Sequence, residues 1–171
     1  FELFDLDPKA YFNYKKKETI CNYFWEDETT FSAKANPQQF VADAAQTFQT
    51  PVKKLEKYLA QNKKKYDLTA SIFLEKSLHK LNTYLSKDTL KSVVSVHRLN
   101  INKSLDAVNS KTFSNPHLIQ LFNRYATYNG SSPYKTPGIM SMIPHLEMHY
   151  GTFYPKGGMH RISQSLFELA K

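Results

Sequence analysis

The chain has 171 residues, of which 41% are apolar and 14% aromatic, a composition that supports one hydrophobic core and excludes a disordered segment. Its net charge is +8, but the only arginines, the side chains that commonly read base edges, are Arg98, Arg124 and Arg161, so nucleic acid is not an expected partner. No apolar run of about 18 residues and no signal peptide occurs, and the single cysteine, Cys21, favours a reducing, cytoplasmic location.

A hairpin followed by a series of helices is the organisation that the residue pattern predicts. Strand-forming residues flank a polar turn, and the helix starts carry capping residues, several of them followed by Pro at the first helical position. The expected elements, in chain order, are strands at 18–25 and 29–33, helices at 37–48, 51 to about 85, 88–97, 116–129 and 139–148, a strand at 152–154 and a helix at 159–170.

Glycine, proline and the spacing of the strands refine this prediction. Asn129-Gly130 predicts a helix end in the left-handed conformation, and an interior Pro144 predicts a bent helix. The strands at 20–33 and 152–154 are far apart in the sequence, and if they share one small sheet the helices must pack against it as a group. We therefore predict an α+β fold, a mostly helical domain packed on a small, largely antiparallel sheet, with residues 1–171 forming a single domain.

Common catalytic and cofactor motifs do not occur in the sequence. The five glycines form neither the dinucleotide fingerprint nor a P-loop. His145 and His149 lie one helical turn apart, but Glu147 breaks the order of a zinc-protease motif, so no metal is expected. The lysine runs at 15–17 and 63–65 are interpreted as solvated faces, with contact to an anionic surface as the alternative.

Both ends of the chain read as internal segments. Residues 151–171 have the pattern of a strand, a glycine turn and an amphipathic helix that lacks a terminating Gly or Asn. The chain also begins at Phe1 rather than at Met. We therefore expect it to be one piece of a longer protein.

Two stretches together resemble a known family. Residues 121–134, Leu-Phe-Asn-Arg-Tyr-Ala-Thr-Tyr-Asn-Gly-Ser-Ser-Pro-Tyr, are followed after a helix-length spacer by residues 151–159, Gly-Thr-Phe-Tyr-Pro-Lys-Gly-Gly-Met. In this order they resemble the middle region of bacterial-type phytoene desaturases, FAD-dependent carotenoid desaturases of the flavin amine oxidase superfamily. Residues 21–33 resemble the opening of that family's substrate domain.

The resemblance implies a substrate-binding domain without its flanking FAD-binding segments. In the complete protein FAD would accept hydride equivalents from a long apolar polyene, such as phytoene or a diapophytoene-like precursor, so this domain need supply no acid, base or metal. The isolated fragment would be inactive and would bind little or no FAD. Catalytic residues are not identified.

The resemblance also assigns roles to particular residues. It places Gly157, Gly158 and Met159 near the cofactor, whereas the spacing alone is that of an ordinary strand-to-helix turn. Packing or ion pairing is the alternative role for the residues that it assigns to the substrate. The substrate-binding residues that it implies are Arg124, Tyr125, Tyr128, Tyr134, Met140, Tyr154 and Arg161.

Two other functions remain open from the sequence. One is a different oxidoreductase of the same superfamily, such as a retinol saturase-like enzyme. The other is a non-catalytic basic module that docks on anionic membrane through the lysine runs at 15–17 and 63–65. Because carotenoid precursors reside in membranes, peripheral contact with the inner face of the membrane is also compatible with the desaturase hypothesis.

Overall fold

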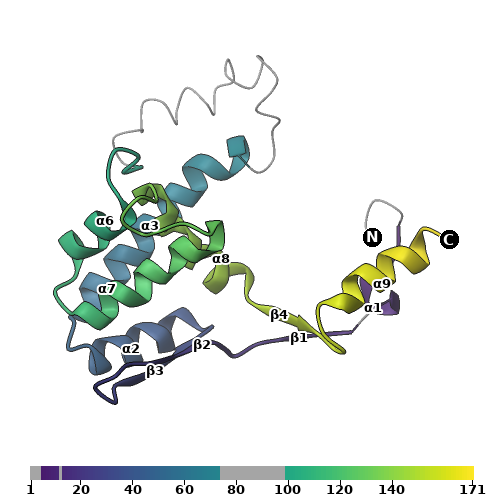
Figure 1. Ribbon diagram of the computed structural model, residues 1–171, viewed down its shortest axis with the longest axis horizontal. Coiled ribbons are helices and arrows are strands. Elements are labelled where there is room, and N and C mark those ends of the chain that lie inside the picture. Colours follow the sequence, from purple (N-terminus) through teal and green to yellow (C-terminus); the bar gives the residue numbers. More distant parts are fainter. Residues whose placement is uncertain (1–4, 12, 74–98) are drawn as a thin grey trace.

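The computed structural model describes residues 5–11, 13–73 and 99–171, and it has two parts (Figure 1). A helical body holds most of the elements, and an arm extends from it. The body contains β2 (Thr19–Phe24), β3 (Thr30–Lys34), α2 (Pro37–Thr47), α3 (Val52–Phe73), α6 (Leu105–Thr112), α7 (Pro116–Asn123), the 3₁₀ helices η3 (Arg124–Asn129) and η4 (Gly138–Met142), and α8 (Ile143–Tyr150). The arm contains α1 (Pro8–Tyr11), β1 (Tyr14–Lys16), β4 (Phe153–Pro155) and α9 (His160–Leu169).

The structure confirms an α+β fold with small antiparallel sheets. Asn36 begins α2 and Asn115 begins α7, and each side chain accepts a main-chain N–H three residues later, with Pro at the start of the helix. These are the caps that the sequence predicts. The predicted helix at 88–97 and the C-terminal part of the one at 51–85 lie outside the described residues.

Two of the predicted helices differ from expectation. The helix at 116–129 changes at Arg124 from α7 to the 3₁₀ helix η3, although Gly130 does end it in the left-handed conformation, with φ +59°. The predicted bend at Pro144 is wrong, because the segment at 139–148 divides into η4 and α8 and Pro144 falls in the first turn of α8. There its missing N–H removes no helical hydrogen bond.

The prediction that residues 20–33 and 152–154 share one sheet is also wrong. β2 pairs with β3, whereas β4 pairs with β1 in a separate antiparallel ribbon, with Lys15 opposite Tyr154. Among the described strands, the β2–β3 hairpin pairs only within itself, and it buries Phe31 and Ala33 in the core. β4 instead pairs with β1, which contains two lysines of the run at 15–17. Lysine is uncommon in strands, so the sequence pattern does not predict a strand there.

Aromatic rings dominate the core of the body. Phe122 lies at its centre, with its ring centroid 4.6 Å from that of Tyr58 and 5.2 Å from that of Phe113. These rings come from α3, α7 and the loop between α6 and α7, so the core joins segments that are distant in the sequence. Among the described residues, no helix combines the length and the apolar character needed to cross a bilayer.

A chain of buried polar side chains fixes α6 to its neighbours. The Tyr58 hydroxyl donates to Asn109 Oδ1 (2.6 Å), Asn109 Nδ2 donates to Asn123 Oδ1 (2.8 Å), and Asn123 Nδ2 donates to Asp106 (2.7 Å). Asn109 is fully buried, so its amide must be hydrogen-bonded to avoid a large desolvation cost. This network sets the position of α6 against α3 and α7.

Replacing Asn109 should therefore lower stability strongly. We expect Asn109→Ala to reduce the free energy of unfolding by about 2–4 kcal/mol, because it leaves a cavity and two unpaired polar atoms. Ser110→Ala, at an exposed position of the same helix, should change it by less than about 0.5 kcal/mol. Urea denaturation of both variants measures the difference, and equal effects would show that the network is unimportant.

Candidate functional site

A buried carboxylate gathers three of the predicted substrate residues. Glu147 lies on α8 with 7% of its surface exposed, and its side chain meets η3. The Tyr125 hydroxyl donates to Oε2 (2.8 Å), the Tyr128 hydroxyl donates to Oε1, and an Arg124 terminal nitrogen lies 3.4 Å from each oxygen. We call these four residues, together with Tyr23, the Glu147 cluster.

Arg124 links this cluster to the hairpin. Its Nε donates to the Tyr23 hydroxyl at 2.6 Å, and its guanidinium lies 4.5 Å from the centroid of the Tyr125 ring and 5.7 Å from that of Tyr23. The same side chain therefore makes an ion pair with Glu147 and cation–π contacts with three rings, the third being that of Tyr128 at 5.9 Å. The prediction from spacing that Arg124 and Tyr128 share a face is confirmed, since both contact Glu147.

Burial controls the protonation of the cluster. It raises the pKa of Tyr125 well above its ordinary value, with the nearby Glu147 carboxylate adding to the effect, and it raises the pKa of Tyr128 to about 12. Burial alone would lower the pKa of Arg124, but Tyr125, Tyr23 and Glu147 raise it. At neutral pH the tyrosines are thus neutral hydrogen-bond donors and Arg124 is a cation. The cluster is a set of polar side chains bonded to one another, and it offers no free nucleophile.

Only one ring of the cluster reaches well into solvent. Tyr128 is 55% exposed, although Glu147 holds its hydroxyl. Because its polar end is already bonded, the ring can offer an apolar face in a fixed orientation. Met140 lies nearby, with its sulfur 3.3 Å from the amide nitrogen of Asn129, and packs against the core.

The remaining predicted residues lie elsewhere. Tyr154, Gly157, Gly158, Met159 and Arg161 are neighbours in the arm, and no hydrogen bond or ring contact between described residues joins them to the Glu147 cluster. Tyr134 is 71% exposed in the turn between η3 and η4. The structure therefore divides the predicted site residues into a group on the body, a group in the arm and an isolated Tyr134.

The turn that joins β4 to α9 requires both of its glycines. Gly157 and Gly158 have φ values of +87° and +89°, a conformation that L side chains rarely adopt. Lys156 N–H donates to Asn13 and Gly158 N–H donates to Pro155. Within the described part of the chain, the N–H groups of Gly157, Met159 and His160 have no hydrogen-bond acceptor, so they remain available at the start of α9.

Three features of the structure were not predicted. Glu147 and Tyr23 join the cluster through contacts that leave no local pattern in the sequence. Lys65, interpreted as part of a solvated face, is instead buried with 6% exposed, and its Nζ lies 2.5 Å from Ser141 Oγ. His145 and His149 stack at 5.1 Å, but the described residues contain no group of three metal-ligating side chains.

Comparison with known proteins identifies the family. No protein-family model matches the chain. It is 62% identical over 165 residues to a 1-hydroxycarotenoid 3,4-desaturase of Flavobacterium sp. (strain P99-3). It is 38% identical over 68 residues to a 4,4'-diapolycopene oxygenase of Methylomonas sp. and 34% identical over 91 residues to a 4,4'-diaponeurosporene oxygenase of Staphylococcus aureus (strain USA300).

These matches confirm the resemblance inferred from the two motifs. The chain belongs to the carotenoid desaturase family, whose named members here are oxidoreductases that act on carotenoids. The match covers 96% of the chain but only 34% of the Flavobacterium desaturase. It covers 14% and 18% of the two oxygenases, so the chain spans about a third or less of the relatives that it matches.

Neutralising the central carboxylate should weaken the fold. Glu147→Gln keeps the shape of the side chain but leaves the partly buried Arg124 without its counter-charge, and we expect a loss of about 2–4 kcal/mol in the free energy of unfolding. Glu56→Gln, at an exposed position of α3, should have an effect below about 0.5 kcal/mol. Chemical denaturation compares the two, and a Glu147→Gln variant as stable as the original would rule out a structural role for the cluster.

Proposed function

We propose that this chain is the substrate-binding segment of an FAD-dependent desaturase that acts on a 1-hydroxycarotenoid or a similar linear carotenoid. The observation that carries the proposal is the 62% identity over 96% of the chain to the 1-hydroxycarotenoid 3,4-desaturase. A diapo-type polyene is the alternative substrate, supported by the weaker matches to the two oxygenases. The phytoene substrate that the motifs first suggested has no separate support.

The body offers a surface suited to an apolar chain. Tyr128 presents its ring at the edge of the Glu147 cluster, and Met140 lies beside the same 3₁₀ helix. Apart from the hydroxyl at its end, a 1-hydroxycarotenoid has no polar group, so contact area and shape must position its chain. A ring that a buried carboxylate already holds loses little entropy on binding. In this account Arg124, Tyr125 and Glu147 position Tyr128, and Tyr128 contacts the substrate.

The turn at 157–159 fits the edge of a flavin. Two positive-φ glycines expose main chain without a Cβ, and the N–H groups of Gly157, Met159 and His160 lie at the start of α9. Such groups can donate to the carbonyl oxygens and ring nitrogens of an isoalloxazine or to a phosphate. When bound, FAD would supply the electron acceptor that removal of hydrogen from an unactivated carbon chain requires.

Activity of the complete protein tests the proposal. The full coding sequence that contains these residues, expressed and supplied with FAD and a 1-hydroxycarotenoid, should yield a product lighter by two hydrogen atoms in mass spectrometry.

We expect Gly158→Ala to lower flavin content and turnover several-fold, because φ +89° is strained for any residue with a Cβ.

Gly130→Ala provides the matched control. Gly130 also has a positive φ of +59°, but a Cβ there would meet no atom within 4 Å, and the residue lies in the body. This variant should lose a similar amount of stability, about 1 kcal/mol, while keeping its flavin. Equal flavin loss in both variants would show that the turn at 157–159 does not contact the cofactor, and absence of any desaturated product would reject the function.

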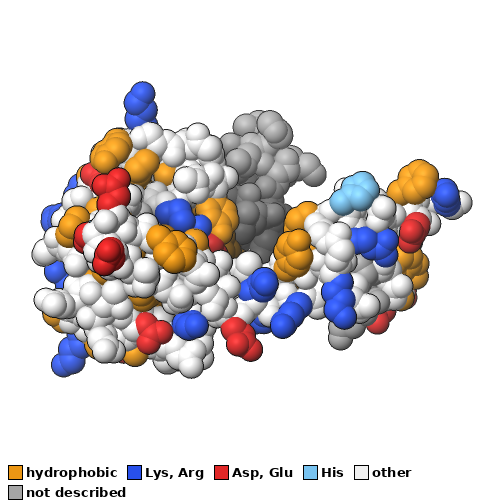
Figure 2. All heavy atoms as spheres, turned by 60° about the horizontal axis from the view of Figure 1, so that its bottom comes forward, with side chains coloured by type: hydrophobic (Ala, Val, Ile, Leu, Met, Phe, Trp, Pro, Cys, Tyr) orange, Lys and Arg blue, Asp and Glu red, His pale blue; other side chains and the backbone are white. Residues whose placement is uncertain are grey.

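The arm has a surface suited to peripheral binding to a membrane. The β1–β4 ribbon exposes Tyr14, Phe153 and Tyr154 beside its lysines, with Lys16 Nζ 5.7 Å from the Phe153 ring and Lys17 Nζ 5.7 Å from the Tyr154 ring. Figure 2 shows basic and apolar side chains next to one another along the arm. This combination suits the boundary between anionic headgroups and acyl chains, and we infer docking at the cytoplasmic leaflet.

Vesicle binding separates this docking from non-specific charge. Replacing Lys15, Lys16 and Lys17 with Gln should weaken binding to anionic vesicles by roughly a hundredfold, since each surface lysine contributes on the order of 1 kcal/mol. The same replacement of the exposed Lys53, Lys54 and Lys57 on α3 removes equal charge and should have a much smaller effect. Cosedimentation at low and high salt measures both, and equal losses would remove the ribbon from the membrane contact.

A further inference from the structure

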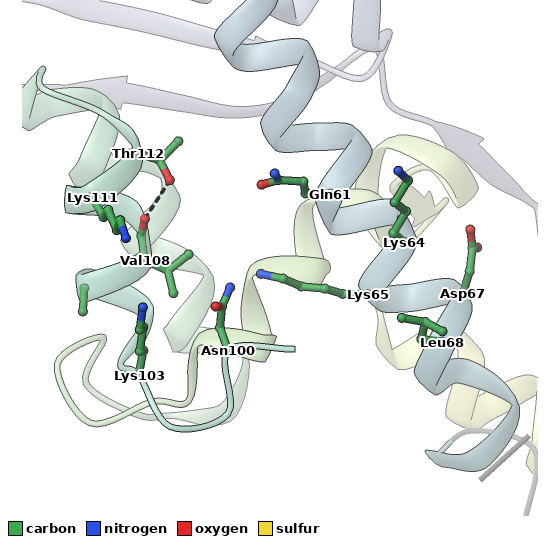
Figure 3. A pocket seen from close by; sticks show the side chains of 11 residues that line it. Gln61, Lys64, Lys65, Asp67, Leu68, Asn100, Lys103, Val108, Lys111 and Thr112 are labelled. Atoms are coloured by element: carbon green, nitrogen blue, oxygen red, sulfur yellow. Dashed lines mark hydrogen bonds between the residues drawn. The ribbon is translucent and has the colours of Figure 1, made fainter. Parts of the chain in front are cut away.

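A wide cavity lies between α3 and α6 (Figure 3), and its described lining includes no residue of the Glu147 cluster or of the arm. Its volume is about 850 Å³, and the segment before α6 completes its wall. Lys65 extends from α3 across this space toward Asn100, while Lys103 and Lys111 come from the opposite wall (Figure 3). The proposed desaturase function uses none of these residues.

The lining has an excess of positive charge. Among the described residues, Lys64, Lys65, Lys103 and Lys111 line the cavity, against the single carboxylate of Asp67. That carboxylate is bound by Lys63 at 2.7 Å, so it does not neutralise the cavity. In the described part of the chain, no carboxylate forms an ion pair with any of the four lining lysines.

Lys65 is the distinctive member of this set. It is 94% buried, being 6% exposed, and its Nζ donates to the hydroxyl of Ser141 at 2.5 Å while that hydroxyl donates to the Gly138 carbonyl at 2.8 Å. An ammonium has three donors, and the contacts between described residues use one of them. A buried cation without a counter-ion is costly, and this burial lowers the pKa of Lys65 to about 8.

We propose that the cavity binds a phosphate group, held by Lys65 from α3 and by Lys103 and Lys111 from the opposite wall. Lysines that converge from different segments suit the multiply charged, roughly spherical phosphate, whereas a planar carboxylate is commonly held by the two-pronged guanidinium of arginine. The amide of Asn100 provides a further donor. A bound anion would supply the counter-charge that no described residue provides for Lys65.

The cavity is much larger than one phosphate, so the group belongs to a larger molecule. Leu68 and Val108 line the same space and can contact an organic portion. A phospholipid headgroup and a soluble phosphate ester share this chemistry, and the experiment has to distinguish them.

Calorimetric titration of the complete protein that contains these residues, with inorganic diphosphate and at constant ionic strength, tests the site. Lys65→Met keeps the unbranched apolar stem of the side chain and removes the charged end, and we expect it to weaken binding roughly tenfold or more. Lys57→Gln, on an exposed part of the same helix, should leave binding within about twofold. Because the anion stabilises charged Lys65, binding near pH 8 should take up protons in the original chain and not in Lys65→Met.

Vesicles that contain phosphatidic acid in phosphatidylcholine provide the second arm. Binding of these vesicles that depends on Lys65, with or without binding of diphosphate, identifies a lipid headgroup as the source, and binding of diphosphate alone identifies a soluble ligand. Lys111→Gln is an exposed substitution that repeats the test if Lys65→Met does not fold. If neither probe binds in a manner that depends on Lys65 or Lys111, the site does not exist.

Discussion

The interaction on which the rest of the structure depends is the burial of the Glu147 carboxylate against η3. A buried carboxylate is stable only when its oxygens are bonded, and Arg124, Tyr125 and Tyr128 bond both of them. This contact joins the end of one helical segment to α8, and α8 leads directly into β4 of the arm. Arg124 extends the constraint to the hairpin through Tyr23.

This constraint relates the two groups of predicted site residues. The body group surrounds Glu147, whereas the arm group lies around the turn at 157–159, and the chain between them is short. A polyene that contacts Tyr128 and a flavin that contacts the turn would therefore bind to parts of the chain that are joined through α8, the helix that Glu147 holds against η3. In this account the flavin would accept the hydrogen equivalents, so no acid or base is needed from the described residues. The tyrosines of the cluster stay protonated at neutral pH and serve as hydrogen-bond donors to Glu147.

Local signals in the sequence predicted local structure well. The caps at Asn36 and Asn115 and the left-handed Gly130 depend on neighbouring residues alone. Features that depend on distant partners were not predictable: β1 consists largely of lysines and forms only because β4 pairs with it, and Lys65 is buried by η4. The pattern around Glu147 indicates only a broken histidine motif. Its hydrogen-bond partners lie 19 to 23 residues away, so no local pattern predicts its role in the cluster.

A crystal structure of the complete protein with FAD and a bound carotenoid tests the central claim most directly. We predict that the isoalloxazine lies against the main chain of Gly157 and Gly158 and that the polyene passes the ring of Tyr128, with Glu147 still bonded to Arg124. An isoalloxazine remote from that turn, or a polyene that touches neither the turn nor the Glu147 cluster, would contradict the assignment.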